Sequence, residues 1–477
     1  MEMKKRTKIV ATIGPASNSE RVLKKMIESG MNVARINFSH GSYESNEKLI
    51  NNIRKIAKKK GISVGIMADL QGPRIRIALE NDLPVKVGEY VNVSDTSSPK
   101  DNGGKSIKLD WKGIIKNIAV GNEILIEDGL IKIKVTEKKK NFLITKVIDG
   151  GTIKNHKGVN VPDARLAVGA VTKKDEEDLK FALDRDVDFV ALSFVSNGKE
   201  ITKVKNKIKR ILGRNHNLPQ IISKIERKEA IKNIDEIIVA SDAIMVARGD
   251  LGIEIEESKV VIFQKDLVAR SLKAGKPVIV ATQMLNSMIE NPRPTRAEVS
   301  DVSNAVIDHA DAVMLSGETA NGKYPVESVK TMTEIIQRTE ESPFDDLEHG
   351  FLSDNKASVS AAIAHSAHEL SKDSGAKAIV VASISGSAAR MLSRHRPKQP
   401  IFVMTNNEKT HSQVSLLWGT ESFVLSDCHN LEELITKSMN ALLKNKVLNK
   451  KDKVVIVAGR PGAKREHMSF VKVEELK

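Results

Sequence analysis

The sequence of 477 residues has a single cysteine, few aromatic residues and no long hydrophobic run. Cys428 by itself cannot form an internal disulfide, which is typical of proteins in a reducing compartment. No apolar stretch approaches the ~20 residues that a membrane-spanning helix needs. The apolar run behind the basic first residues, Ile9–Ile13, is too short for a signal peptide. We therefore expect a cytoplasmic protein with no membrane partner.

The formal net charge of +15 admits two explanations. Basic proteins often bind nucleic acids by neutralising phosphates, but aromatic residues make up only 3% of this chain, too few for the stacking platforms that bind single strands. The lysines are also dispersed over segments typical of solvated helix surfaces, such as Lys55–Lys60, Lys203–Lys209 and Lys444–Lys453. We favour a lysine-rich surface that attracts anionic substrates, and we expect no nucleic-acid partner.

The length of the chain predicts two to four domains, and the first of them opens with alternating strands and helices. Apolar segments predict strands at Thr7–Gly14, Asn32–Phe38 and Val64–Leu70. Ser17 or Asn18 is the expected N-cap of the first helix, and Tyr43–Lys60 is the second helix.

Between Pro73 and Ala164 the pattern changes to short strands and turns. Strands are expected at Pro84–Val93, Glu123–Ile126, Leu130–Val135 and Phe142–Val147. Turn signals such as Asp128-Gly129 and Gly150-Gly151 separate them. This region predicts a β domain, residues 73–164, inserted after the third strand.

The alternation then resumes and completes a barrel. Strands are expected at Phe189–Phe194, Gln220–Glu226, Ala243–Asp250, Pro277–Met284 and Asp311–Glu318. Thr295 and Glu298 form a capping box that opens one of the helices between them. Eight strands, each followed by a helix, predict a (β/α)₈ barrel from residues 1–72 and 165–342, with its active site at the carboxyl ends of the strands.

A charged linker near Glu340–Asp354 leads to a third domain, residues 343–477. Helices and strands are expected at Val359–Ser371, Ala376–Ser383, Ser387–His395, Pro400–Met404, Leu431–Lys444 and Lys453–Ala458. This order predicts an open, doubly wound α/β sheet.

The expected strand Gln220–Glu226 ends in a lysine and a carboxylate two residues apart. Because side chains alternate along a strand, Lys224 and Glu226 point to the same face. The next strand brings a second carboxylate, Asp250, to the same end of the barrel. Two carboxylates suit Mg²⁺ or Mn²⁺, and a lysine beside them would face a developing anion.

Other strand ends also carry polar side chains, and each one alone is equally well explained as a helix cap, a turn or a solvated strand end. They are Arg35, Asn37 and Ser39 after the second strand, Asp69 after the third, Thr282 after the seventh, and Ser316 and Glu318 after the eighth. Their common placement at one face of a barrel favours an active site.

These residues lie in motifs of a known family. The sequence resembles pyruvate kinase from end to end, through Lys8–Ser17, Asn32–Gly41, Ile221–Glu226, Met245–Ile255, Ala281–Leu285, Asn291–Glu298 and Asp311–Ala320. The domain order agrees as well: a barrel, a β cap inserted after the third strand, and a C-terminal α/β domain.

The resemblance implies transfer of the phosphoryl group of phosphoenolpyruvate to ADP, giving pyruvate and ATP. It also implies that Glu226 and Asp250 bind the divalent metal, that Lys224 neutralises charge on the phosphoryl group and the enolate oxygen, and that Arg35 binds the phosphate. The carboxylate would be bound by Gly249, Asp250 and Thr282, and the enolate would be protonated near Thr282 with Ser316 and Glu318. The implied nucleotide-binding residues are Asn37, Phe38, Ser39, His40, Arg76 and Lys157. Because Arg76 and Lys157 flank the cap, cap closure would complete the site.

One departure from the family concerns potassium. Potassium-dependent members carry a glutamate where this chain has Arg74, and a threonine where it has Ile77. A fixed positive charge could replace bound K⁺, so we expect K⁺ to be dispensable. The monovalent-cation positions of the family are nevertheless matched by Asn37, Ser39, Asp69 and Leu70.

A second departure concerns regulation. The family uses the loop matched by Ser385-Gly386-Ser387 for sugar-phosphate effectors, although this sequence is also an ordinary helix entry. The last loop, Gly459–Arg465, lacks the usual Gly-Thr-Thr-Asn run but is basic, which leaves a sugar-phosphate or nucleotide effector open. Family members are commonly homotetramers.

Two other functions compete with a kinase. A barrel lysine at a strand end is also the nucleophile of Schiff-base aldolases, but Glu226 would keep Lys224 charged and disfavours this chemistry. A basic nucleic-acid-binding protein on a barrel scaffold is the other alternative.

Overall fold

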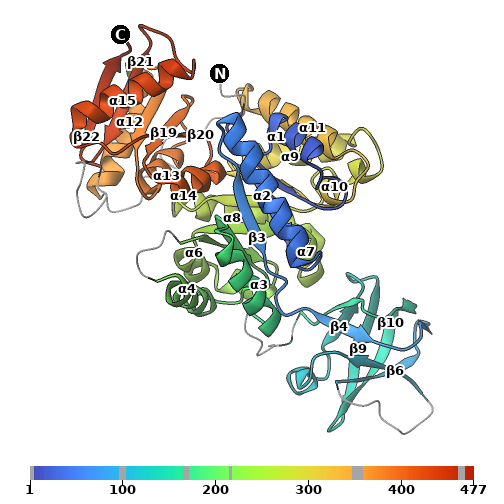
Figure 1. Cartoon of the computed structure of the whole chain (residues 1–477). Helices are drawn as coiled ribbons and strands as arrows, with labels where there is room; N and C mark the ends of the chain where they lie inside the picture. Colours follow the sequence, from blue (N-terminus) through green and yellow to red (C-terminus); the bar gives the residue numbers. More distant parts are fainter. Residues whose placement is uncertain are drawn as a thin grey trace.

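The computed structural model describes residues 5–95, 104–162, 164, 171–213, 218–345, 358–459 and 468–477. Figure 1 shows three bodies along the chain: a central barrel, a cap of strands that stands away from it at the lower right, and a C-terminal domain at the upper left. Most of the expected linker after Asp345 and the basic loop after Gly459 lie outside the described residues.

The central body is the closed eight-stranded barrel that the sequence predicts, with every strand pair parallel. Its strands are β1 (Lys8–Thr12), β2 (Val33–Asn37), β3 (Gly65–Asp69), β13 (Phe189–Leu192), β14 (Gln220–Ile225), β15 (Ala243–Ala247), β16 (Val278–Ala281) and β17 (Ala312–Leu315). Most are apolar along their whole length because they are buried on both faces, by helices outside and by one another inside.

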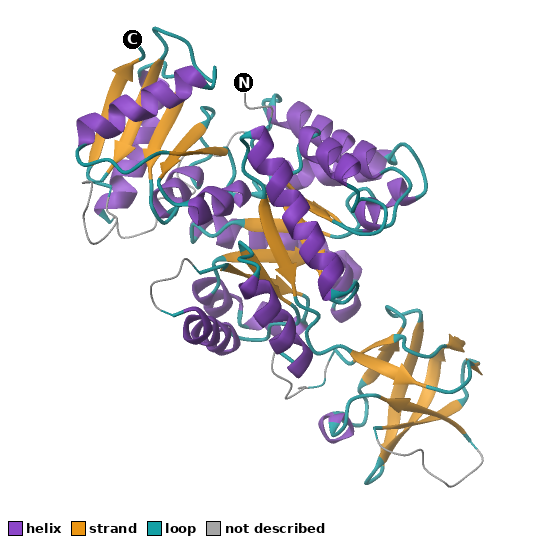
Figure 2. Cartoon of the chain, in the orientation of Figure 1, coloured by secondary structure: helices purple, strands orange, loops and turns teal. Residues whose placement is uncertain are grey.

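The helices surround this barrel (Figure 2). They are α1 (Glu20–Glu28), α2 (Tyr43–Lys60), α3 (Lys173–Asp184), α4 (Gly198–Leu212), α5 (Lys228–Lys232), α6 (Ile234–Ala240), α7 (Arg248–Glu254), α8 (Glu257–Lys273), η2 (Asn286–Ile289), α9 (Arg296–Ile307), α10 (Gly317–Ala320) and α11 (Pro325–Glu340). The capping box of Thr295 and Glu298 is confirmed. The expected N-cap of α1 was wrong: Ser19 caps it, whereas Ser17 Oγ accepts a hydrogen bond from Gly14 N. None of the described helices is both long and apolar enough to cross a membrane.

The inserted cap is a small closed barrel of its own, with the strand order β10-β6-β7-β4-β12-β8-β9, and the pair β11-β5 stands beside it. The elements are β4 (Ile75–Ala78), β5 (Leu83–Val85), β6 (Tyr90–Ser94), β7 (Lys105–Leu109), η1 (Ile114–Asn117), β8 (Glu123–Ile126), β9 (Ile131–Lys138), β10 (Phe142–Asp149), β11 (Gly151–Ile153) and β12 (Gly158–Asn160). The expected single strand Pro84–Val93 was wrong, because a turn at Gly88, with φ 87°, divides it.

The C-terminal domain holds a five-stranded sheet in the order β20-β19-β18-β21-β22, in which only β22 is antiparallel. Its elements are α12 (Val359–Asp373), β18 (Ala378–Ala382), α13 (Ser387–Ser393), β19 (Ile401–Thr405), α14 (Glu408–Gln413), η3 (Val414–Leu416), β20 (Thr420–Val424), α15 (Leu431–Lys444), β21 (Lys453–Ala458) and β22 (Phe470–Glu475). Helices α12 and α13 pack on one face and α15 on the other, which confirms the doubly wound arrangement.

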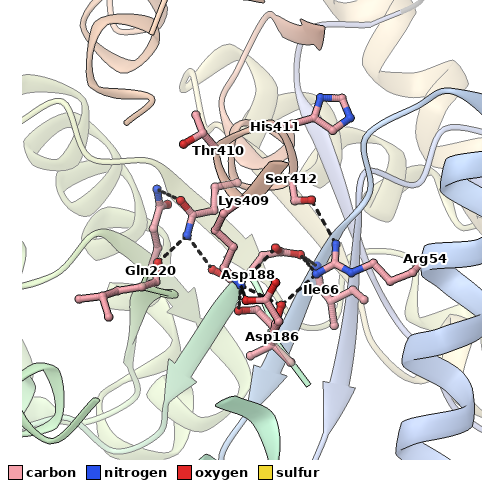
Figure 3. A network of polar contacts seen from close by, with 12 residues as sticks. Arg54, Ile66, Asp186, Asp188, Gln220, Lys409, Thr410, His411 and Ser412 are labelled. Carbon is pink, nitrogen blue, oxygen red and sulfur yellow. Dashed lines mark hydrogen bonds and ion pairs between the residues drawn. The ribbon is translucent and has the colours of Figure 1, made fainter. Parts of the chain in front are cut away.

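The C-terminal domain docks on the amino ends of the barrel strands. Arg396 Nη2 lies 2.9 Å from Asp311 Oδ2, one residue before β17, and both side chains are almost fully buried. Figure 3 shows a second contact, in which Lys409 reaches from α14 to Asp186 and Asp188, in the turn before β13. The carboxyl ends of the strands therefore face away from this domain.

Candidate active site

Lys224 lies at the centre of a cluster of charges at the carboxyl end of β14. Its Nζ atom lies 2.9 Å from Glu226 Oε1 and 3.4 Å from Asp69 Oδ1. It also donates a hydrogen bond of 2.8 Å to Ser193 Oγ. The predicted pairing of Lys224 and Glu226 on one face is thus confirmed, and β3 and β13 add Asp69 and Ser193 from the neighbouring strands.

Lys224 and Asp69 hold each other in the ionised state. Burial by itself would lower the pKa of Lys224, but Asp69 and Glu226 outweigh burial, so its pKa lies above the ordinary value. Burial would raise the pKa of Asp69, yet Lys224 and Arg35 together bring it below the ordinary value. A lysine that stays protonated is a poor Schiff-base nucleophile, which disfavours the aldolase alternative.

Glu226 and Asp250 form the acidic side of the cluster. Glu226 Oε2 accepts a hydrogen bond of 2.7 Å from Phe194 N. Burial raises the pKa of Glu226, and the charge of Asp250 raises it further against the opposing effect of Lys224. A buried carboxyl group and a partly buried one that repel each other suit a bound divalent cation, because the cation would neutralise both.

The position of Asp250 corrects a prediction. The strand expected at Ala243–Asp250 ends at Ala247, and Asp250 lies in the first turn of α7. The carboxylate still lies at the carboxyl end of the barrel, because α7 begins directly where β15 ends and β15 pairs with β14. Among the described residues, no group of three or more His, Cys, Asp and Glu side chains could hold a metal ion. A cation at Glu226 and Asp250 would therefore take its remaining ligands from water or substrate.

Arg35 at the end of β2 is held in place by its neighbours. Its Nε and Nη2 atoms each lie 2.6 Å from Asp69 Oδ2, and Nη1 donates a hydrogen bond of 2.8 Å to Thr12 Oγ1. The side chain is mostly buried, at 12% exposed. Such a fixed guanidinium is suited to binding a phosphate.

Thr282 lies in a strained turn after β16. Its φ is 71° and that of Gln283 is 54°, both in the left-handed region that threonine and glutamine rarely adopt. Gly249 N donates a hydrogen bond of 2.8 Å to Thr282 Oγ1, which joins this turn to α7. Arg248 Nη2 donates to Thr282 O at 2.7 Å and holds the turn from outside. The structure thus brings Thr282 and Gly249 together.

Glu318 and Ser316 differ in how they are bonded. Glu318 lies in α10 rather than in the strand expected there, because β17 ends at Leu315. Both carboxylate oxygens of Glu318 accept backbone hydrogen bonds, from Ser316 N at 2.7 Å and Leu285 N at 3.0 Å. By contrast, the buried Ser316 Oγ has no hydrogen-bond partner within the described residues.

The proposed nucleotide residues are divided between barrel and cap. Asn37, Phe38, Ser39 and His40 occupy the end of β2 and the turn after it, where Asn37 Oδ1 accepts a hydrogen bond from Ser39 N. Arg76 and Lys157 belong to the cap: Arg76 Nη1 donates to His156 O, and Lys157 pairs with Glu127.

Among the described residues, few polar contacts join the cap to the barrel at this end. Asn160 Nδ2 donates a long hydrogen bond of 3.4 Å to Glu254 Oε1, at the end of α7. Arg74 points into the cap, where its Nη2 atom lies 3.5 Å from Asp128 Oδ1. The Leu70 carbonyl accepts a hydrogen bond from Ser193 Oγ at 2.8 Å. In this arrangement the cap stands open (Figure 1).

Three residues of the site were missed in the sequence: Ser193, Thr12 and Arg248. Ser193 directly follows β13 and Thr12 ends β1, so the rule that polar residues at strand ends mark the site would have found both. Arg248 reads as a surface charge in the sequence, and only its contacts with Thr282 and Asp301 reveal its position.

Comparison with known proteins agrees with this architecture. The family model for the pyruvate kinase barrel domain matches residues 4–329, and that for the pyruvate kinase alpha/beta domain matches residues 361–474. The chain belongs to the pyruvate kinase family. It is therefore an enzyme of glycolysis, a phosphotransferase for which phosphoenolpyruvate and ADP are the implied substrates. Membership also implies dependence on a divalent metal and on potassium.

Individual pyruvate kinases match the chain over nearly its whole length. The chain is 40% identical to the pyruvate kinase of Geobacillus stearothermophilus, covering 99% of this chain and 80% of that protein. It is 38% identical to the pyruvate kinase of Clostridium perfringens, covering 99% of this chain and 100% of that protein. The crystal structure of a pyruvate kinase from Cryptosporidium parvum superposes with a TM-score of 0.93 at 35% identity, covering 99% of this chain and 97% of that one.

Proposed function

We propose that Lys224, Glu226 and Asp250 form the reaction centre of this pyruvate kinase. The observation that carries the proposal is the contact of Lys224 Nζ with Glu226 at 2.9 Å, beside the charge of Asp250. Phosphoryl transfer requires little covalent chemistry from a protein and mainly needs positioning and neutralisation of negative charge. A buried, permanently charged lysine next to a cation site meets both needs.

Glu226 and Asp250 would hold Mg²⁺, or Mn²⁺ in its place. The carboxylate oxygens are the hard ligands that these ions prefer, and their mutual repulsion supports the assignment. When bound, the ion neutralises charge on the phosphate and the enolate.

The remaining residues bind and orient the substrate. Arg35, aimed by Asp69 and Thr12, binds the phosphate. Lys224 neutralises the charge that develops on the transferring group and on the enolate oxygen. The backbone at Gly249 and the hydroxyl of Thr282 bind the carboxylate.

The enolate is protonated from the side of Thr282. Ser316 Oγ, which is buried without a hydrogen-bond partner among the described residues, supports a role in carrying that proton. Glu318 is better explained as a positioning residue, since both of its oxygens bond to backbone.

The nucleotide binds between the turn after β2 and the cap. Asn37, Phe38, Ser39 and His40 contact it from the barrel, and Arg76 and Lys157 contact it from the cap once the cap closes. The open arrangement and the few polar contacts between the described residues of the cap and the barrel support such a movement.

A coupled assay with phosphoenolpyruvate, ADP and Mg²⁺ tests the proposed centre. We expect Lys224→Met to lower kcat by about a hundredfold to a thousandfold, since removing one preorganised charge-stabilising group costs about 10²–10³ in rate. Lys55→Met, which removes a lysine that is 66% exposed on α2, is the matched control. Chelation of the metal with EDTA should abolish the activity of the wild type. Activity retained by Lys224→Met or in EDTA would refute the assignment.

We propose further that K⁺ is dispensable, in contrast to the general dependence of the family. Asp69, one of the four positions of the monovalent-cation site, already pairs with both Lys224 and Arg35. Arg74 adds a positive charge in the cap, where its Nη2 atom lies 3.5 Å from Asp128 Oδ1. Rates measured with K⁺, Na⁺ and tetramethylammonium should be similar, and Arg74→Glu should become K⁺-activated. Strong K⁺ activation of the wild type would contradict this prediction.

Several broader features complete the proposal. We place the protein in the cytoplasm as a homotetramer, and we assign residues 1–72 with 165–342 to the barrel, 73–164 to the cap and 343–477 to the C-terminal domain. An effector at the Ser385–Ser387 loop is consistent with the position of that loop before α13. The basic loop Gly459–Arg465, which would accompany it, lies almost wholly outside the described residues.

A further inference from the structure

Helix α3 begins at the base of the cap (Figure 1). The chain leaves the barrel for the cap after β3, through Gly72, and it returns to the barrel at Thr172, the N-cap of α3. One carboxylate in the first turn of α3 bonds to both segments. Asp175 Oδ1 accepts a hydrogen bond of 3.0 Å from Gly72 N, and Asp175 Oδ2 accepts one of 2.7 Å from Thr172 N. The buried Asp175 therefore joins the two segments that carry the cap.

Gly72 is also held from its other side. Its φ of 69° lies in the left-handed region, and a Cβ atom added there would lie 3.0 Å from Ser193 Cβ. Ser193 Oγ in turn accepts a hydrogen bond from Lys224 Nζ. The segment that enters the cap is thus fixed between α3 and the proposed reaction centre, and we expect the movement of the cap to begin beyond Gly72.

A lysine of the same helical turn reaches the nucleotide turn (residues 37–42, between β2 and α2). Lys174 Nζ donates a hydrogen bond of 2.9 Å to Phe38 O. On the other side, Phe38 N donates one of 3.0 Å to Asp69 O at the end of β3. The backbone of Phe38 is therefore bonded both to the barrel sheet and to α3, so α3 helps to set the position of the nucleotide turn.

The far end of the nucleotide turn is bonded to α3 as well. Lys174 Nζ lies 2.6 Å from Asp178 Oδ2, one turn further along α3. Asp178 is buried, and its Oδ1 atom accepts a hydrogen bond of 2.8 Å from Tyr43 Oη. Because Tyr43 is the first residue of α2, Lys174 and Asp178 together hold the chain on both sides of the exposed residues 40–42.

Aromatic packing adds a second connection between the same segments. The rings of Tyr43 and Phe181 of α3 are stacked, with centroids 4.6 Å apart. Phe38 meets Phe181 edge-on, with centroids 5.9 Å apart. Both geometries are favourable for aromatic pairs. One ring of α3 therefore packs against both ends of the nucleotide turn, in a chain in which aromatic residues make up only 3%.

We propose that the first two turns of α3 position the nucleotide turn for ADP and keep it fixed relative to the base of the cap, with Lys174 as the positioning residue. The inference rests on the proposed function, which assigns the nucleotide to this turn. Lys174 acts through the Phe38 carbonyl, so its removal should change the affinity for ADP more than it changes the chemical step.

Calorimetric titration of the full chain with ADP, in the presence of Mg²⁺, tests the proposal without relying on activity. Lys174→Met should raise the Kd for ADP by about tenfold, because a hydrogen bond from a charged donor is lost. Lys180→Met removes an exposed lysine from the same helix and should bind ADP as the wild type does. In the coupled assay the KM for ADP should rise with the Kd, whereas kcat and the KM for phosphoenolpyruvate should change much less.

Two further variants separate positioning from a structural role. The Lys174 side chain is 53% exposed, so its ion pair with Asp178 contributes little to stability and Lys174→Met should unfold near the temperature of the wild type. Asp178→Asn removes the ion pair but leaves Lys174 free to bond to Phe38 O, so Lys174→Met should still weaken ADP binding when it is added to Asp178→Asn. Lys174→Arg keeps the positive charge and should recover part of the affinity.

The proposal is overturned if the wild type does not bind ADP, or if Lys174→Met binds it as tightly as the wild type. It is also overturned if Lys180→Met weakens binding as much as Lys174→Met, if the effect of Lys174→Met disappears in Asp178→Asn, or if Lys174→Arg binds no better than Lys174→Met. A wild type that binds ADP with this dependence on Lys174 but transfers no phosphoryl group would refute the proposed reaction and support the positioning role.

Discussion

Lys224 forms ion pairs with two carboxylates, and these two ion pairs explain how a charged group can be stable inside the barrel. Asp69 lies between Arg35 and Lys224, and Lys224 lies between Asp69 and Glu226, so positive and negative charges alternate. A buried ion pair is stable only while both partners are present, because removing one leaves an uncompensated charge. Each of these charged side chains therefore fixes the position of the ones that it contacts.

Ser193 is an uncharged group in direct contact with Lys224, and we expect it to position the ammonium. Its Oγ accepts a hydrogen bond from Lys224 Nζ and donates one to Leu70 O, both at 2.8 Å. Ser193→Ala removes a hydrogen bond to a charged group, about 1.5–3 kcal/mol, so kcat should fall by about tenfold or more. The KM for phosphoenolpyruvate should change less than kcat.

The control for Ser193 is another buried serine. Ser271 Oγ on α8 has no hydrogen-bond partner within the described residues, so Ser271→Ala should leave kcat unchanged. Ser193→Thr keeps the hydroxyl and should restore part of the activity. If Ser193→Ala lowers thermal stability but not kcat, the residue has only a structural role.

The sequence predicted the residues of this site that share one face of a strand or stand at the end of a strand. Lys224 and Glu226 were found because two positions of one strand share a face, and Asp69 because it ends a strand of the barrel. Ser193 follows a strand too, but serine is so common at strand ends that its contact with Lys224 could not be inferred. That contact depends on the closure of the barrel, which brings β13 and β14 together.

At the scale of the elements, α7 was the clearest error. The apolar run from Ala243 predicted a strand as far as Asp250, but the chain turns into a helix at Arg248. Leu251 explains part of this turn, because the helix buries that side chain completely. The same turn places Gly249 N against Thr282 Oγ1.

Arg248 links α7 to the strained turn after β16, and its removal should disturb catalysis. Arg248 Nη2 holds Thr282 O at 2.7 Å, and Nη1 lies 2.7 Å from Asp301 Oδ1. Without these contacts the left-handed turn can relax, and a displacement of about 1 Å can cost about 10²-fold in rate. We therefore expect Arg248→Met to lower kcat by about tenfold to a hundredfold.

Steady-state kinetics and thermal unfolding distinguish this effect from a loss of folding. Arg338→Met, which changes an arginine that is 84% exposed on α11, is the matched control and should behave as the wild type. A variant with normal kcat and a lower melting temperature would show that Arg248 only stabilises the fold.

The cap shows why short strands are hard to predict. Its longest strands, β9 and β10, were expected, whereas the three-residue strands β11 and β12 were not. A strand of three residues gives almost no alternation to recognise. Its partners are also distant in the sequence: β12 pairs with β4, some 80 residues earlier, as in the register of Gly158 with Arg76.

At the scale of the whole molecule, the two ends of the barrel have different functions. The carboxyl ends of the strands carry the proposed active site, and the amino ends carry the C-terminal domain. The strand–helix alternation predicted the barrel and the insertion. It could not predict the interface, because Lys409 and Arg396 read as solvated surface charges until two distant segments meet.

Lys8 gives this interface a pH dependence that can be measured. Its side chain, 5% exposed at the start of β1, donates a hydrogen bond of 2.6 Å to Thr420 O of the C-terminal domain. Burial lowers the pKa of Lys8 from 10.5 to about 8, although Glu421, Glu340 and Asp311 act in the opposite direction. The unfolded chain thus keeps this proton up to higher pH than the folded one.

The sign of the effect follows from this difference. Below about pH 8 the folded protein bears a buried charge, at a cost of about 3 kcal/mol for a shift of this size. Between about pH 8 and 10.5 the folded state releases the proton while the unfolded state keeps it, so stability gains with rising pH. Lys8→Met removes this cost and also the hydrogen bond to Thr420 O, which is worth about 1.5–3 kcal/mol while the lysine is charged and so offsets part of the gain.

We therefore expect Lys8→Met to have a higher melting temperature than the wild type at pH 7. This difference in melting temperature should become smaller by pH 10. Calorimetric scans of both proteins across this range measure it. Lys24→Met, which removes an exposed lysine on α1, should have the same melting temperature as the wild type at either pH. A Lys8→Met variant that is less stable at pH 7, or a gap that does not depend on pH, would mean that the ammonium is charged without cost where the two domains meet.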